Sequence, residues 1–251
     1  MSLSSTSFEI IAFDADDTLW HNENRYQAAK NDFVHLMAAF QKPERVAEVL
    51  DEIELGNLSL YGYGMKSFAL SMIETALALS DGKISGREIS AILAIARRVL
   101  TAPVELFPHV AETIAKLAEQ YDLMLITKGD ASEQEQKLSR SGIEHYFRAV
   151  EIVHDKTVST YQVILAKYHL SSQRFVMIGN SLRSDILPVV QLGGIAIYIP
   201  HELTWAHELD HNGTLAEGSY YQIERIDQLP ALLDRLRETL ILNPPTTPFL
   251  K

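Results

Sequence analysis

The fold is decided by the stretch Phe8-Glu9-Ile10-Ile11-Ala12-Phe13-Asp14-Ala15-Asp16-Asp17-Thr18-Leu19-Trp20, an apolar run that ends in three carboxylates and a threonine. Its first half has the length and composition of a strand buried within a parallel sheet. In open α/β sheets, ligands bind just beyond the carboxyl ends of such strands. The stretch therefore predicts an interior strand that delivers Asp14 and Asp16 to a ligand-binding edge.

The paired aspartates point to a metal ion and to phosphoryl chemistry. Two carboxylates one residue apart repel each other and lose solvation together, so a protein that places them side by side usually supplies a cation. Magnesium is the natural candidate, because it takes oxygen ligands and leaves positions for water and phosphate. An ionised aspartate can also attack phosphorus, while a second aspartate passes a proton to the leaving group. The alternative is an Asp-rich turn or helix N-cap. A calcium loop is disfavoured, because the glycine that its pattern requires is missing here.

Composition and charge narrow the class of protein. The 251 residues, 47% of them hydrophobic, are enough for one large or two modest domains. A net charge of −11 argues against nucleic acid or an anionic membrane as a partner, and the absence of cysteine excludes disulfides and thiolate chemistry. Residues 1–7 lack the pattern of a signal peptide, and no apolar stretch is long enough to span a bilayer. We expect a cytoplasmic protein, and its oligomeric state is left open.

The segment from residue 22 to residue 101 shows helical periods and no convincing strand. The apolar residues within 23–40, for example, fall on one helical face. We therefore predict an inserted all-α domain over residues 21–103, and a discontinuous core formed by residues 1–20 and 104–251. The helices expected in the insertion cover 23–40, 43–55, 67–79 and 86–100.

A loop is expected over residues 58–66, between the second and third of these helices. Gly56 is expected to end the helix before it, and further glycines give the loop conformational freedom. Two interpretations are open: the loop is a plain connection with surface tyrosines, or Tyr61 and Lys66 contact a polar ligand.

From residue 104 onwards, helices and strands alternate along the chain, the signature of a parallel sheet covered by helices on both faces. The expected strands cover 123–126, 149–153, 175–178, 195–199 and 220–223, and the expected helices cover 109–120, 132–141, 157–168, 185–192 and 227–242. The predicted fold class is α/β: a doubly wound parallel sheet with a Rossmann-like core and the inserted all-α domain.

Polar residues follow four of the expected strands, and the carboxyl ends of parallel strands share one edge of a sheet. We therefore expect a single site although its members are scattered over most of the chain. Phosphoryl transfer needs little beyond positioning and charge stabilisation, which such a set provides. The candidate residues are Asp14 and Asp16 after the first strand, Thr127, Lys128 and Gly129 as phosphate contacts, Lys156 as a counter-charge, and Asn180 and Asp185 as metal ligands.

These residues resemble the motifs of the haloacid dehalogenase superfamily: D-x-D-x-T at Asp14 to Thr18, the strand-end Thr127, Lys156, and G-N-S-x-x-S-D from Gly179 to Asp185. The resemblance covers nearly the whole chain and implies a type-I helical cap. It implies that Asp14 is the nucleophile and a metal ligand, and that Asp16 is the general acid/base and binds magnesium through its backbone carbonyl. Thr127 would bind phosphate, and Lys156 would stabilise the nucleophile and the intermediate.

Two positions refine the function that the resemblance implies. Asp16 favours a phosphatase, because dehalogenases and phosphonatases of the superfamily lack an acid there. Asn180 departs from the family pattern, in which aspartate is common, although its amide oxygen can still face a metal. The predicted function is a magnesium-dependent phosphatase that hydrolyses a small phosphorylated metabolite through an aspartyl-phosphate. The alternatives are a phosphomutase, or a binding or regulatory protein with weak activity, and no motif encodes the substrate.

A competing motif occurs late in the chain, because residues 207–211 (HELDH) satisfy the zinc pattern H-E-x-x-H. Asn212 and Gly213 follow at once, and no third ligand is evident. A solvated loop is the favoured interpretation.

Overall fold

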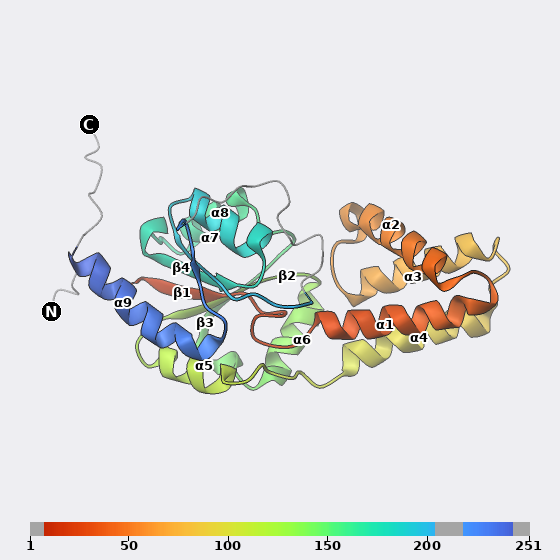
Figure 1. The fold of residues 1–251 in the computed structure, drawn as a ribbon, viewed down its shortest axis with the longest axis horizontal. Coiled ribbons are helices and arrows are strands. Elements are labelled where there is room, and N and C mark those ends of the chain that lie inside the picture. Colours follow the sequence, from red (N-terminus) through yellow and green to blue (C-terminus); the bar gives the residue numbers. More distant parts are fainter. Residues whose placement is uncertain (1–7, 204–217, 243–251) are drawn as a thin grey trace.

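The computed structural model of the chain describes residues 8–203 and 218–242. Figure 1 shows a layered α/β core and a unit of four helices that projects from one end of it. The strands of the core are β1 (Ile10–Phe13), β2 (Leu123–Lys128), β3 (Phe147–Val153), β4 (Phe175–Gly179), β5 (Ile195–Tyr198) and β6 (Tyr221–Gln222). Its helices are α5 (Val110–Ala118), α6 (Ala131–Ser141), α7 (Val158–Lys167), α8 (Leu187–Gln191) and α9 (Leu229–Leu242).

The strands form one six-stranded sheet in the order β3-β2-β1-β4-β5-β6, and every pair is parallel. The strand β1 lies inside the sheet, where Ile11 pairs with Leu123 on one side and with Val176 on the other. The order reverses direction at β1, which places a ligand-binding crevice beyond its carboxyl end. The predicted doubly wound α/β fold is confirmed.

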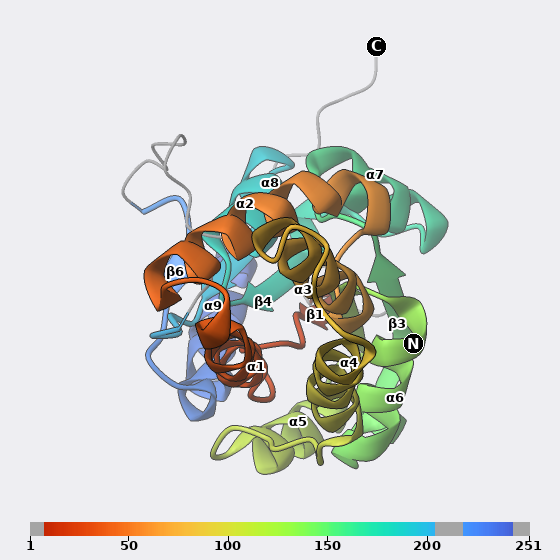
Figure 2. The ribbon, with the colours of Figure 1, turned by 90° about the vertical axis from the view of Figure 1, so that its right-hand side faces the viewer.

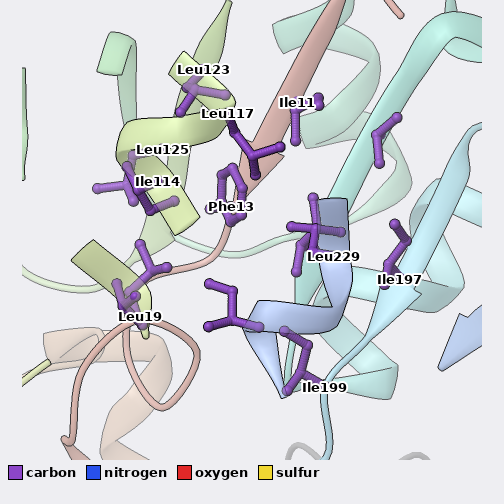
Figure 3. Close-up of a cluster of buried hydrophobic side chains, with 14 of the residues drawn as sticks. Ile11, Phe13, Leu19, Ile114, Leu117, Leu123, Leu125, Ile197, Ile199 and Leu229 are labelled. Carbon is purple, nitrogen blue, oxygen red and sulfur yellow. The ribbon is translucent and has the colours of Figure 1, made fainter. Parts of the chain in front are cut away.

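Both faces of β1 are buried, which explains its unbroken apolar sequence. Because successive side chains of a strand point to opposite faces, Ile11 and Phe13 join the cluster under α5 and α9, whereas Ile10 and Ala12 join the cluster under α7 and α8. Figure 3 shows the first cluster, in which Phe13 lies among side chains of the sheet and of the covering helices. Burial on both faces holds the end of β1 in a fixed position.

The projecting unit consists of α1 (Glu23–Leu36), α2 (Pro43–Tyr61), α3 (Met65–Leu79) and α4 (Gly86–Thr101). Figure 2 shows this unit in front of the core, with α1 and α4 viewed nearly along their axes and α2 running across the view. It has its own hydrophobic cluster, whose fully buried members include Phe33, Leu50, Met72 and Ile92. A separate core is what a separately packed unit needs. The domain division at residues 20 and 103 stays a prediction.

The sequence interpretation is wrong for the connection between α2 and α3. Helix α2 continues through Gly56 to Tyr61, because the exposed Gly56 costs only about 1 kcal/mol in a helix whose other face is packed. The turn is formed instead by Gly62 and Gly64, with φ of 72° and 114°, values that other residues rarely adopt. The expected loop over 58–66 is thus reduced to a connection of three residues.

Other boundaries differ by a few residues. The helix expected over 23–40 ends at Leu36 and continues as a 3-10 turn over Met37–Ala39. The helix expected over 185–192 begins earlier, with a π-helical turn over Leu182–Ile186, before α8. Among the helices of the described residues, none is both long enough and apolar enough to cross a membrane.

Candidate active site

The candidate site lies at the carboxyl edge of the sheet, beneath the helical unit. The structure brings all the strand-end residues expected there into the lining of one cavity of about 820 Å³. The other walls come from α1, α2 and the connection between α2 and α3. The residues brought together are Asp14, Asp16, Thr127, Lys128, Gly129, Lys156, Asn180 and Asp185.

Lys156 links the two buried aspartates of the site. Its Nζ atom lies 2.5 Å from Asp14 Oδ1 and 2.7 Å from Asp185 Oδ1, and its side chain is only 1% exposed. Burial alone would lower the pKa of Lys156, but the two carboxylates raise it well above its ordinary value. Lys156 is therefore a permanent cation at the centre of the site.

Asp185 is held close to the sheet. Its Oδ2 atom accepts a hydrogen bond of 3.0 Å from the backbone N–H of Ser181. A Cβ atom at position 179 would lie 2.2 Å from Asp185 Oδ2, so only glycine allows this approach. Burial raises the pKa of Asp185 to about 7, against the opposing effect of Lys156. Gly179 in the G-N-S-x-x-S-D run thus has a packing role.

Thr18 connects Asp14 to Asn180. Its hydroxyl donates to Asp14 Oδ2 at 2.7 Å and lies 3.3 Å from Asn180 Oδ1. With Lys156 on Oδ1 and Thr18 on Oδ2, the carboxylate of Asp14 is fixed from both sides and buried. A fixed carboxylate facing a cavity is suited to attack a bound electrophile.

Asp16 is held by three donors, one from the segment between β1 and α1 and two from α6. Trp20 Nε1 donates to its Oδ1 atom at 2.7 Å, and Gln134 Nε2 donates to its Oδ2 atom at 2.8 Å. Lys137 Nζ lies 3.0 Å and 2.9 Å from the two carboxylate oxygens. Neither Gln134 nor Lys137 was predicted from the sequence, although their three-residue spacing on the helix after Thr127 places them on one face.

Asp17 shapes the passage from the sheet into the helical unit. It has a left-handed backbone conformation, with φ of 60°, and its carboxylate accepts hydrogen bonds from the backbone N–H groups of Asn22 and Glu23. It therefore satisfies free amides at the start of α1. Burial raises the pKa of Asp17 to about 7. Asp17 thus binds amides at the start of α1 from outside the helix, whose N-cap residue is Asn22.

The structure places neither Tyr61 nor Lys66 in the cavity. Tyr61 ends α2 and donates its hydroxyl to Glu74 at 2.9 Å, while Lys66 donates to Asp130 at 2.8 Å. The cavity lining does not support their expected contact with a substrate, which stays a prediction. The connection lines the cavity through Tyr63, whose ring lies 4.5 Å from Lys128 Nζ.

The oxygen atoms at this edge fit the chemistry of magnesium. Asp14 and Asp185 offer carboxylates and Asn180 offers a neutral amide oxygen, all of which are hard ligands. Within residues 8–203 and 218–242, no three His, Cys, Asp or Glu side chains gather in a metal-binding arrangement. A metal at this edge would thus depend on two carboxylates and the amide. The H-E-x-x-H stretch at residues 207–211 lies outside the described residues.

Comparison with known proteins establishes the family. A model of haloacid dehalogenase-like hydrolases matches residues 8–193, so the chain belongs to this family of hydrolases. This confirms the superfamily and the hydrolase class expected from the D-x-D-x-T motif.

Among individual proteins, a glyceraldehyde 3-phosphate phosphatase from Methanothermobacter thermautotrophicus is 28% identical over 212 residues, covering 80% of this chain and 89% of the relative. A protein of the same name from Methanocaldococcus jannaschii is 28% identical over 205 residues, covering 75% and 83%. A haloacid dehalogenase-like hydrolase from Xanthomonas campestris has a crystal structure that matches with a TM-score of 0.83 and 37% identity, covering 94% of this chain and 98% of that one. The two archaeal relatives are therefore both named as phosphatases.

Proposed function

We propose that this protein is a magnesium-dependent phosphatase that hydrolyses a small phosphorylated metabolite through an aspartyl-phosphate on Asp14. The observation that carries the proposal is the environment of the Asp14 carboxylate. This carboxylate is shielded from bulk solvent, is oriented by Lys156 and Thr18, and lines the cavity. Two relatives named glyceraldehyde 3-phosphate phosphatase support the same reaction class. Magnesium bound by Asp14, Asn180, Asp185 and the backbone carbonyl of Asp16 would neutralise charge on the phosphoryl oxygens.

The reaction proceeds in two steps at these residues. An Asp14 oxygen bonds to phosphorus while the bond to the leaving oxygen breaks, and Asp16 gives that oxygen a proton. Water then attacks the aspartyl-phosphate and returns a proton to Asp16, which releases phosphate and restores Asp14. Thr127 and the backbone N–H group of Lys128 hold the phosphoryl oxygens, and Lys156 offsets their charge. The backbone N–H of Gly129 donates instead to the carbonyl oxygen of Val153 at 3.2 Å, so Gly129 contributes through its backbone conformation.

The helical unit, residues 21–103, serves as the cap that shapes the part of the cavity away from the phosphate. Its wall carries Glu23, Asp51 and Glu54. Lys30 is engaged by Asp51 at 2.5 Å, and the described residues show no hydrogen bond or ion pair to Glu54. Burial and the neighbouring acids raise the pKa of Glu54 to about 7. This wall favours leaving groups without negative charge.

The cytoplasmic location expected from the sequence stays a prediction.

The function is tested by assaying the purified protein with magnesium on an aryl phosphate and on a panel of metabolite phosphates that includes glyceraldehyde 3-phosphate. We expect phosphate release that depends on magnesium. No turnover of any substrate, with or without added divalent ions, would contradict the proposal. A requirement for a bisphosphate activator would indicate the phosphomutase instead.

The acidic wall makes a prediction about charge. Glyceraldehyde 3-phosphate and 3-phosphoglycerate differ in a carboxylate at the far end, so kcat/KM should favour the aldehyde by about tenfold or more at pH 8, the effect of ~1.4 kcal/mol of repulsion. Glu54 ionises as the pH rises through about 7, so the preference should be larger at pH 8 than at pH 6. Glu54→Gln should weaken the preference and its dependence on pH.

Glu52→Gln is the matched control for this test, because Glu52 lies on the same helix, is exposed and does not line the cavity. It should behave like the wild type at both pH values. If the ratio of kcat/KM between the two substrates were the same in the wild type and in Glu54→Gln, the acidic wall would not discriminate between substrates by charge.

Asn180 makes a prediction about the metal. An amide in place of a carboxylate removes one negative charge beside a divalent ion, so Asn180→Asp should lower the magnesium concentration needed for half-maximal activity. Asp185→Ala should raise it steeply or abolish activity. Initial rates titrated with magnesium measure both effects. An unchanged titration for Asp185→Ala would refute the metal assignment. A wild type that is inactive at every magnesium concentration, together with an active Asn180→Asp variant, would favour a binding protein.

A further inference from the structure

Helix α6 lies where the core meets the helical unit (Figure 1). Its side chains Gln134 and Lys137 both donate to Asp16. The helix begins directly after β2, where the carboxylate of Asp130 accepts a hydrogen bond from the backbone N–H of Glu133. Gln134 is further fixed by a bond from Nε2 to the backbone oxygen of Lys128 at 3.0 Å. The donors that face Asp16 are therefore on a rigid element.

Lys137 is the charged member of this pair and is largely buried, with 15% of its side chain exposed. Its Nζ atom contacts both oxygens of Asp16 and donates to Asn22 Oδ1 at 2.8 Å, and Glu133 Oε1 lies 3.6 Å away. Three N–H groups meet three near acceptors, so the ammonium has one preferred orientation. Asn22 immediately precedes α1, so Lys137 joins Asp16 to the start of the helical unit.

We infer that Lys137 is a positioning residue for Asp16 in the transfer of a proton to the leaving group, an inference that rests on the proposed phosphatase function. The bond from phosphorus to the leaving oxygen breaks, its electron pair stays on that oxygen, and the proton of Asp16 moves to it. Asp16 becomes a carboxylate, and Lys137 takes no part in the transfer of the proton. The ammonium lies where this negative charge forms and holds the carboxylate toward the cavity.

This role has a consequence that depends on the leaving group. An alkyl phosphate needs a proton on its departing oxygen, whereas an activated aryl phosphate such as 4-nitrophenyl phosphate barely does. Lys137→Met should lower kcat for the alkyl phosphate about 100-fold and for the aryl phosphate less than about threefold, with little change in KM. Lys137→Arg keeps the charge and should restore most of the activity.

A double-mutant cycle separates positioning from direct substrate contact. If Lys137 acts through Asp16, Lys137→Met added to Asp16→Ala should cause no further loss on the alkyl phosphate. Arg140→Met is the matched control, because Arg140 lies on the same helix and also joins it to the helical unit, through the backbone oxygen of Leu100, without contacting Asp16. It should affect both substrates to the same extent. Thermal unfolding of each variant monitors the fold, and Lys137→Gln replaces Lys137→Met if the latter does not fold.

The experiment distinguishes the two levels of the proposal. Equal losses on both substrates, or a further loss in the Asp16→Ala background, would overturn the positioning role while wild-type turnover leaves the phosphatase intact. A wild type inactive on both substrates would overturn the phosphatase function and this inference with it. A selective loss on the alkyl phosphate, absent without Asp16 and restored by arginine, is the result we expect.

Discussion

Asp14→Asn is expected to lower kcat by about four orders of magnitude or more, the scale seen when a catalytic nucleophile is removed. An amide cannot form the acyl-phosphate, and no other carboxylate is held as Asp14 is by Lys156 and Thr18 within the described residues. The fold should survive, because Lys156 keeps its contact with Asp185 and the repulsion between two buried carboxylates is relieved. We expect Tm within about 4 °C of the wild type, a shift of ~1 kcal/mol at this length.

Asp122→Asn is the matched control for this variant. Asp122 precedes β2 at the opposite edge of the sheet, is exposed, and contacts Arg148 on the surface. It should leave kcat unchanged. A folded Asp14→Asn protein with activity near that of the wild type would exclude Asp14 as the nucleophile.

The second large effect is expected for Lys156→Met. Removal of the Lys156 ammonium leaves Asp14 and Asp185 buried without their cation. This should lower the free energy of unfolding by about 3–5 kcal/mol in the absence of metal. Separately, loss of charge stabilisation at the phosphoryl group should lower kcat by roughly 10²- to 10³-fold. Thermal unfolding and steady-state kinetics measure the two effects separately.

The loss of stability should depend on pH in a definite direction. Burial raises the pKa of Asp185 from an ordinary 3.8 to about 7, so between these values the folded chain holds a proton that the unfolded chain lacks. Stability therefore falls as the pH rises through this window, and it falls further when Lys156 is absent. Lys156→Met should be closer to the wild type at pH 5 than at pH 8.

Lys167→Met provides the comparison, because the side chain of Lys167 is 58% exposed where it pairs with Glu151. It should change Tm far less, and equally at both pH values. If Lys156→Met were as stable as Lys167→Met at pH 8 without metal, the buried charge cluster would not have the energetic role described above.

The sheet and its strand-end residues could be predicted because they follow from local patterns. The run from Ile10 to Phe13 is apolar throughout because both of its faces are buried, and Asp14 follows where the strand ends at the cavity. Parallel pairing then brings Thr127 and Asn180 to the same edge, whatever their separation in sequence. Such features need no knowledge of which helix packs where.

The donors around Asp16 and the wall of the helical unit could not be predicted in this way. Helical periodicity places Gln134 and Lys137 on one face of α6, but the packing of that helix beside the first motif decides what the face meets. Similarly, a glycine such as Gly56 ends a helix only when no packed face continues beyond it. The aromatic residue of this connection that lines the cavity is consequently Tyr63, two residues after the expected Tyr61.

The most direct test of the proposed chemistry is to trap the phosphorylated protein. The wild type is mixed with magnesium and a substrate, quenched in acid within the turnover time, digested, and analysed by mass spectrometry. We predict a phosphoryl group on the peptide that contains Asp14, removed by mild alkali as expected for an acyl-phosphate and absent from Asp14→Asn. An active wild type that carries no phosphoryl group at any quench time, or carries one on a peptide without Asp14, would contradict the aspartyl-phosphate mechanism.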